Sequence, residues 1–262
     1  MTPDATLARW APAFLLLLAR CGGIVAFTPV LGTRSLPPPA KAGLAATLAL
    51  LLTPLAVGRG LVLPADGPGL AATLAGELAI GAVLGLAARF TFAAIGVAGE
   101  LAGVQMGLGL PAALDPHSQI QVSAVNHIAD QVAIMVFLAA GGHHAVLAAL
   151  AHSLAAVPPL SVGVRGDVVG YLAGLFGTAL QLAVRMAAPA TVATLAAMTA
   201  LGLLNRIAPN LNLFMVSFPI LVGVGLLVLL AALPVYGMVL AEGVRDLPGI
   251  FEQLLARMRH GL

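Results

Sequence analysis

The chain has 262 residues, of which 60% are hydrophobic and only 8% are charged. Soluble domains carry about 25% charged residues, so this composition excludes a soluble globular protein and indicates an integral membrane protein. The formal net charge is only +2 and the arginines are scattered, which excludes the clustered cations of a nucleic-acid-binding surface.

The first half of the chain predicts three membrane helices. A bilayer core of about 30 Å needs about 20 apolar residues in helical form. Apolar stretches run over residues 10–31, 41–57 and 70–106, and proline- and glycine-rich segments separate them. The third stretch would be about 55 Å long as one straight helix, which exceeds the thickness of a bilayer core.

Charged residues lie inside the third stretch. Glu77, Arg89 and Glu100 are each surrounded by apolar residues. A charge facing lipid costs at least about 2.5 kcal/mol, so we expect these side chains to face protein or water. Gly81 and Gly85 are spaced so that another helix backbone can approach, although such pairs also arise by chance among 30 glycines.

Residues 107–118 predict an irregular loop, because two prolines and two glycines interrupt the helical pattern there. The loop is mostly apolar. Irregular backbone at membrane depth is tolerated only where it packs in protein or lines a cavity, so we interpret the segment as a plug. The plug residues that we single out are Gly107, Leu108, Leu110, Pro111, Leu114, Asp115, Pro116 and Ser118.

The helix after the loop, over residues 119–138, is polar in its first half. Asn126 and Asp130 stand four residues apart, so their side chains share one helix face. Two interpretations stay open for this face. It forms interhelical hydrogen bonds between subunits, or Asp130 relays protons.

The sequence lacks the motifs of common catalytic and metal sites. His143, His144 and His152 follow the interruption at Gly141, but their spacing does not match a metal-binding helix. Neither a phosphate-binding glycine loop nor a serine nucleophile elbow is present. We therefore expect no metal, no cofactor and no catalytic activity.

The C-terminal part predicts a long helical hairpin followed by a tail. Apolar tracts over 168–204 and 210–241 flank a short polar turn, and Pro189 lies inside the first tract. The tail, 242–262, has apolar residues at helical spacing and charges of both signs, which predicts an interfacial or cytoplasmic helix. Arg185 lies inside the first tract and should meet protein, water or lipid headgroups.

Two blocks of sequence resemble the FliR family of flagellar export proteins. The order and spacing of these blocks fit that family from about residue 20 to residue 242. The first block comprises Ala98–Leu108 (AGELAGVQMGL), Asp115-Pro116, Ile128-Ala-Asp130, Phe137-Leu138 and Gly141-Gly-His-His144; the second comprises Leu201–Pro209 (LGLLNRIAP) and Asn212–Pro219 (NLFMVSFP).

The resemblance implies an architecture and partners. It implies that residues 1–167 are similar to the FliP subunit, that 168–241 are similar to the FliQ hairpin, and that 242–262 form a separate tail. It also implies one copy of the chain in a helical gate with several FliP and FliQ subunits, with FlhB and FlhA as further partners. The place of the gate is the bacterial cytoplasmic membrane within the flagellar basal body.

The resemblance implies that residues 107–118 block the conduit through which unfolded flagellar proteins pass. The polar residues that we expect to be buried or to contact other subunits are Glu77, Arg89, Glu100, Gln105, Asn126, Asp130, Arg185, Arg206 and Asn210. The sequence thus predicts an all-α, polytopic, lipid-embedded subunit of a flagellar export gate. The alternative is a small-solute or ion transporter, which would need a binding site near the bilayer midplane.

Overall fold

The computed structural model describes residues 3–32, 36–57, 61–108, 124–160, 166–208 and 213–259. Within these ranges the secondary structure is helical, without a strand, which confirms the all-α fold. The helices are α1 (Pro3–Phe27), α2 (Pro38–Val57), α3 (Gly67–Gln105), α5 (Ala124–Ala139), α6 (Gly142–Ala156), α7 (Gly166–Ile207) and α8 (Leu213–Arg259).

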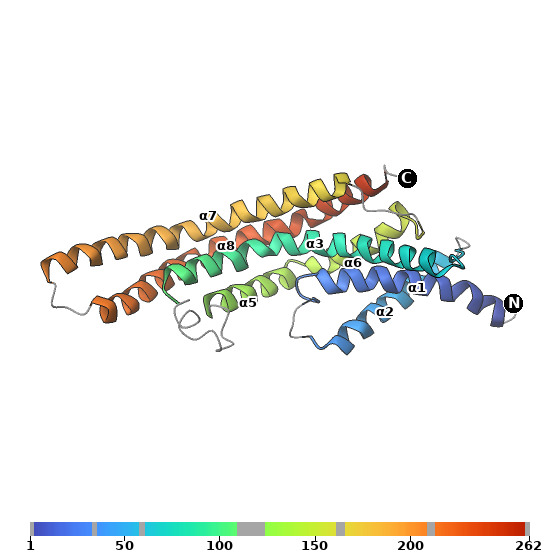
Figure 1. Cartoon of the computed structure of the whole chain (residues 1–262), viewed down its shortest axis with the longest axis horizontal. Coiled ribbons are helices and arrows are strands. Elements are labelled where there is room, and N and C mark those ends of the chain that lie inside the picture. Colours follow the sequence, from blue (N-terminus) through green and yellow to red (C-terminus); the bar gives the residue numbers. More distant parts are fainter. Residues whose placement is uncertain are drawn as a thin grey trace. The chain divides into compact units, whose positions relative to one another are not determined.

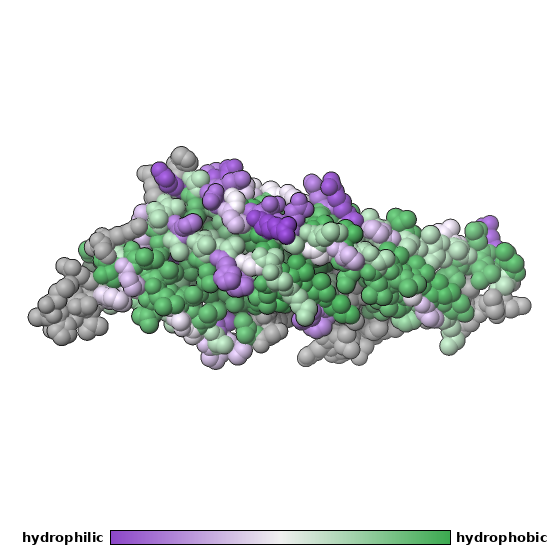
Figure 2. All heavy atoms as spheres, turned by 180° about the vertical axis from the view of Figure 1, so that it is seen from behind, coloured by the Kyte–Doolittle hydropathy of each residue, from purple (hydrophilic) through white to green (hydrophobic). Residues whose placement is uncertain are grey.

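The helices confirm a polytopic membrane protein. Five of the described helices are long and apolar enough to cross a membrane, or up to six if α5 and α6 together count as one span. On the face drawn in Figure 2, hydrophobic residues make up most of the visible surface outside the grey atoms. Leu227 and Leu230 are 70% and 66% exposed, respectively. A surface of this kind is suited to lipid or to other membrane helices rather than to water.

The long C-terminal tracts form two helices. α7 ends at Ile207 and α8 begins at Leu213, so the expected break between the two arms is present. The tail does not form a helix of its own, because α8 continues without interruption to Arg259. Pro234 lies inside α8 and does not end it. The assignment of the three segments to FliP-like, FliQ-like and tail parts stays a prediction.

The chain forms two compact units, and α3, α7 and α8 each contribute to both. Unit 1 comprises Met1–Phe90, Ala140–Phe176 and Val244–Leu262, and unit 2 comprises Thr91–Ala139 and Gly177–Gly243. In unit 1, α2 packs along α1, as Figure 1 shows.

Glycines bring α1 and α3 together in unit 1. A Cβ atom added at Gly23 would lie under 3.0 Å from the carbonyl oxygen of Leu78, and one added at Gly81 would also lie under 3.0 Å from the carbonyl oxygen of Arg20. The two helix backbones are therefore in direct contact, as small residues allow in membrane helices. The packing interpretation of Gly81 is thus confirmed.

The end of α8 supplies part of the core of unit 1. Leu247, Phe251 and Leu254 are buried there, at the helical spacing expected from the sequence. The Arg257 guanidinium lies 4.8 Å from the centre of the Tyr171 ring, which pairs the start of α7 with the end of α8. The apolar face of the expected tail is thus covered by protein.

Unit 2 contains the middle of the α7–α8 hairpin. The Tyr236 hydroxyl of α8 donates a hydrogen bond to the carbonyl oxygen of Met186 in α7. The rings of Phe92 in α3 and Phe137 in α5 meet edge to face, with 5.0 Å between their centres. These contacts hold the second half of α3 against α5 and hold α7 against α8.

Candidate functional site

A C-terminal capping motif ends α3 at a defined residue, directly before the predicted plug. The Gly107 N–H donates to the Val104 carbonyl at 3.0 Å, and the Leu108 N–H donates to the Gly103 carbonyl at 3.0 Å. This pair of bonds is the Schellman motif, which satisfies the last carbonyl groups of a helix. Gly107 has a φ of 79°, in the left-handed region that glycine adopts without steric cost.

The residues around this motif are anchored in the core of unit 2. Met106 is fully buried in a cluster with Ala102 of α3 and Ala190 of α7. Leu108 packs against the same cluster, which matches the apolar contact that accompanies a Schellman motif. The other side chains packed on the cluster belong to α8 and are Val222, Val228 and Leu229. The first residues of the plug segment therefore rest on three helices.

The rest of the predicted plug lies outside the described residues. Gly107 and Leu108 are the plug residues that the structure places. The plug residues outside the described part are Leu110, Pro111, Leu114, Asp115, Pro116 and Ser118.

The predicted polar residues differ in their environments. Glu77 is buried, with 2% of its surface exposed, while Glu100 and Gln105 on the same helix are half-buried. Arg89 of α3 and Asp130 of α5 have exposed side chains. Their expected contacts with other subunits stay predictions.

Two further predicted residues lie on α7. Arg185 and Arg206 have exposed side chains, and Arg206 is in the last turn of its helix, next to the break between α7 and α8. Asn210 and the side chain of Asn126 are outside the described part of the chain.

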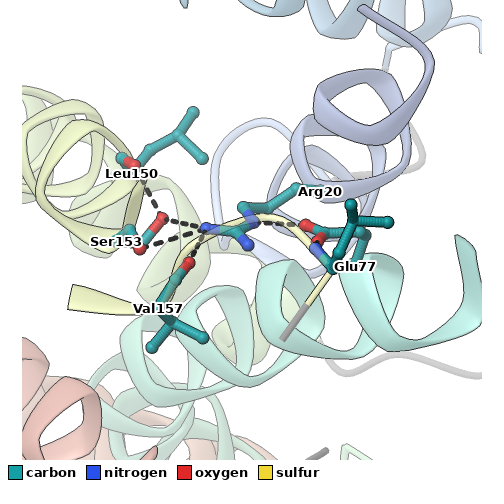
Figure 3. A network of polar contacts seen from close by, with 6 residues as sticks. Arg20, Glu77, Leu150, Ser153 and Val157 are labelled. Carbon is teal, nitrogen blue, oxygen red and sulfur yellow. Dashed lines mark hydrogen bonds and ion pairs between the residues drawn. The ribbon is translucent and has the colours of Figure 1, made fainter. Parts of the chain in front are cut away.

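A buried ion pair joins α1 to α3 in unit 1, and sequence reasoning overlooked its cation. The Arg20 Nε atom donates to Glu77 Oε2 at 2.7 Å, and both side chains are almost completely buried. Figure 3 shows the Arg20 guanidinium between Glu77 and the end of α6.

Three more hydrogen bonds tie the guanidinium to α6. Arg20 Nη1 lies 3.1 Å from the Ser153 carbonyl oxygen, 3.2 Å from Ser153 Oγ and 3.0 Å from the Val157 carbonyl oxygen. Ser153 Oγ in turn donates to the Leu150 carbonyl oxygen at 2.7 Å. The network therefore links three helices through groups that water does not reach.

The sequence contains a signal for this pair. Arg20 and Glu77 are opposite charges, each placed inside an apolar helix where an isolated charge is costly. Opposite charges buried in different helices satisfy one another when the fold brings them together. The separation of 57 positions hides this pairing from any local pattern.

Comparison with known proteins finds relatives that match most of the chain. The model of a family described as bacterial export proteins, family 1, matches residues 11–247. The chain is 31% identical over 234 residues to the flagellar biosynthetic protein FliR of Escherichia coli, covering 86% of this chain and 85% of that protein. It is likewise 31% identical over 229 residues to FliR of Pectobacterium carotovorum, covering 87% of each.

A protein with a different name is similar as well. The chain is 30% identical over 210 residues to the Yop proteins translocation protein T of Yersinia pestis, covering 79% of this chain and 80% of that protein. The resemblance noted in the sequence therefore extends over most of the chain and includes a protein named for translocation.

Proposed function

The chain belongs to family 1 of the bacterial export proteins, and on this premise we propose that its residues 107–118 close the conduit of a flagellar export gate. Membership makes the chain a structural component of a flagellar or type III protein-export apparatus in the bacterial cytoplasmic membrane. The apolar helices agree with that location. The cargo in this proposal is unfolded flagellar protein, and the chain carries out no catalysis of its own.

The partners in this proposal are other membrane subunits. FliP and FliQ surround the chain in the gate, and FlhB and FlhA lie next to it. Exposed apolar side chains on α7 and α8, such as Val192 at 65% and Leu227 at 70%, support this arrangement because they offer a surface for further membrane helices. The charged side chains of Arg89 and Arg185 would meet polar groups of these subunits, since lipid solvates a charge poorly.

The observation that carries the plug assignment is the anchored end of α3. A loop can obstruct a conduit at a fixed place only if the residues from which it starts are held in place. We call these residues, Met106 to Leu108, the root of the plug. The Schellman motif at Gly107 and the burial of Met106 provide such a root. The apolar residues that follow Leu108 then obstruct ions by excluding water, as hydrophobic constrictions do in channels.

Removal of the plug tests the proposal. We expect deletion of Leu110 to Asp115 to increase the passage of small ions across the cytoplasmic membrane while the complex still assembles. Ion flux into cells or into liposomes that contain the purified complex measures this passage. Asp115→Ala is the matched control, because it keeps the length and apolar character of the segment and should not leak.

Three outcomes would reject the plug assignment. The first is an assembled deletion variant that conducts no more than the parent complex. The second is a leak of the same size in Asp115→Ala, which would indicate that charge rather than an apolar obstruction closes the conduit. The third is solute transport by the isolated chain in liposomes, which would favour a stand-alone transporter.

A further inference from the structure

Leu160 adopts a backbone conformation that its side chain disfavours. Its φ is 74°, in the left-handed region, and it is the one non-glycine residue with a positive φ among the described residues. The β-carbon of an ordinary residue crowds the following carbonyl in this region, so the surrounding structure must hold it there. Leu160 follows α6 closely and precedes α7 in the chain.

The Glu77 carboxylate makes a direct contact with this strained residue. The Leu160 N–H donates to Glu77 Oε1 at 3.1 Å. The other carboxylate oxygen, Oε2, accepts from Arg20 Nε at 2.7 Å. The two oxygens of the carboxylate therefore bind different parts of the chain. Oε2 binds α1, and Oε1 binds the segment that follows α6.

Arg20 acts on the end of α6 in the same way. Its Nη1 atom donates to the carbonyl oxygens of Ser153 and Val157, and α6 ends at Ala156. The final carbonyl groups of a helix lack partners within the helix and carry its partial negative charge, so a cation there is favourable. The Ser153 carbonyl also accepts from the Val157 N–H at 2.9 Å, so Arg20 adds a second donor there and supplies a donor to the Val157 carbonyl just beyond the helix.

We propose that Arg20 and Glu77 are positioning residues that end α6 and hold the left-handed turn at Leu160, and thereby determine where the chain leaves α6 toward α7. The pair does more than neutralise two buried charges. Arg20 binds the carbonyl groups of Ser153 and Val157 at the end of the helix, and Glu77 keeps Leu160 in a conformation that it would otherwise leave. This role belongs to the folding of unit 1 and does not depend on the plug assignment.

A coupling experiment separates this role from simple charge neutralisation. The variants are Glu77→Gln, Leu160→Gly and the two combined, each in the full chain, and the readout is the midpoint of thermal unfolding of the purified protein in detergent. Glutamine has one acceptor oxygen where the carboxylate has two, so Glu77→Gln cannot serve both Arg20 and Leu160 fully. Glycine adopts the left-handed conformation without help.

We expect Leu160→Gly to raise the unfolding midpoint more, or to lower it less, in the Glu77→Gln protein than in the parent. Both proteins lose the same Leu160 side-chain contacts, so the comparison cancels that loss. The expected difference between the two shifts in unfolding midpoint is about 3 °C. Glu100→Gln is the matched control, since it removes a carboxylate charge from the same helix, and with it Leu160→Gly should show no such difference.

Equal effects of Leu160→Gly in the parent and in the Glu77→Gln protein would overturn the proposal, because Glu77 would then do nothing for the turn. If Glu77→Gln yields too little protein to measure, Glu77→Asp replaces it. The aspartate keeps the charge but its side chain is one carbon shorter, so it withdraws from Leu160. We expect the same coupling with Glu77→Asp, and its absence would equally overturn the proposal.

Discussion

Met106, at the end of α3, lies against the α-carbon of Gly225 in α8. A Cβ atom built on Gly225 would be 2.8 Å from the Met106 sulfur and closer still to the neighbouring methylene carbon. Met106 is fully buried and directly precedes Gly107, where the predicted plug begins. The absence of a side chain at Gly225 therefore creates the space in which the root of the plug is seated.

Gly225→Ala should disturb the packing of Met106 against α8, which we call the seat of Met106. The added methyl group must push Met106 aside, and overpacking of this kind costs about 1–3 kcal/mol. We expect a lower unfolding midpoint and a small ion leak through the assembled complex. Gly223→Ala, two residues away on α8, is the control, because a Cβ atom there meets nothing within 4 Å. A leak of equal size in both variants would show that the seat of Met106 is unimportant.

Gly107→Ala should strain the end of α3. The φ of 79° is unfavourable for alanine, at a cost of about 1–2 kcal/mol. Gly107→Asn should be tolerated better, because asparagine visits this conformation more readily than alanine. We expect the export of flagellar proteins, measured by secretion into the medium, to fall in the order parent, asparagine variant, alanine variant. If the alanine and asparagine variants export equally, the left-handed conformation of Gly107 is not required.

Gly81→Ala should separate α1 from α3. A methyl group at Gly81 would meet the Arg20 carbonyl oxygen, and backbone atoms cannot rotate away as a side chain does. We expect the free energy of unfolding to fall by about 1–3 kcal/mol, which a lower unfolding midpoint would show. Gly76→Ala on the same helix has open space around its Cβ position and should leave the midpoint unchanged or raise it. A comparable loss at Gly76 would contradict the close crossing as the cause.

Single and paired substitutions should distinguish the parts of the buried network. Arg20→Leu leaves the Glu77 carboxylate buried without its cation, and breaking a buried pair in this way costs about 3–5 kcal/mol. Glu77→Leu should be similarly harmful.

The double variant, Arg20→Leu with Glu77→Leu, should be more stable than either single variant because no unpaired charge remains. It should stay below the parent, since the end of α6 and Leu160 lose their partners. Unfolding midpoints in detergent measure all three variants. A double variant as unstable as the sum of the two single variants would argue against direct pairing.

The sequence by itself determined the class of protein and the course of the chain. Scarce charges and long apolar stretches require helices that span a membrane, because only helices and closed barrels satisfy the backbone there. The helical tracts agree with α1, α2, α3, α7 and α8 to within a few residues, apart from the start of α1 and the end of α8. The break after α3 was likewise predictable, because proline and glycine disrupt helices locally.

The sequence also suggested that the second arm of the hairpin ends at 241, but α8 has no end there. The change from an apolar to a charged pattern there marks a change of surroundings, and helical hydrogen bonding continues across it to Arg259. The same limit applies to Glu77. Its burial was expected, but its partner was not identified.

Only the tertiary structure decided which residues meet. In a helix that is apolar on nearly every side, the hydrophobic pattern does not indicate the face that packs inward. That face depends on where glycines let backbones approach, as at Gly23 and Gly81, and on which distant groups complete a buried charge. The pairing of Arg20 with Glu77 and the seat of Met106 on Gly225 are contacts between segments far apart in the chain, and folding alone brings them together.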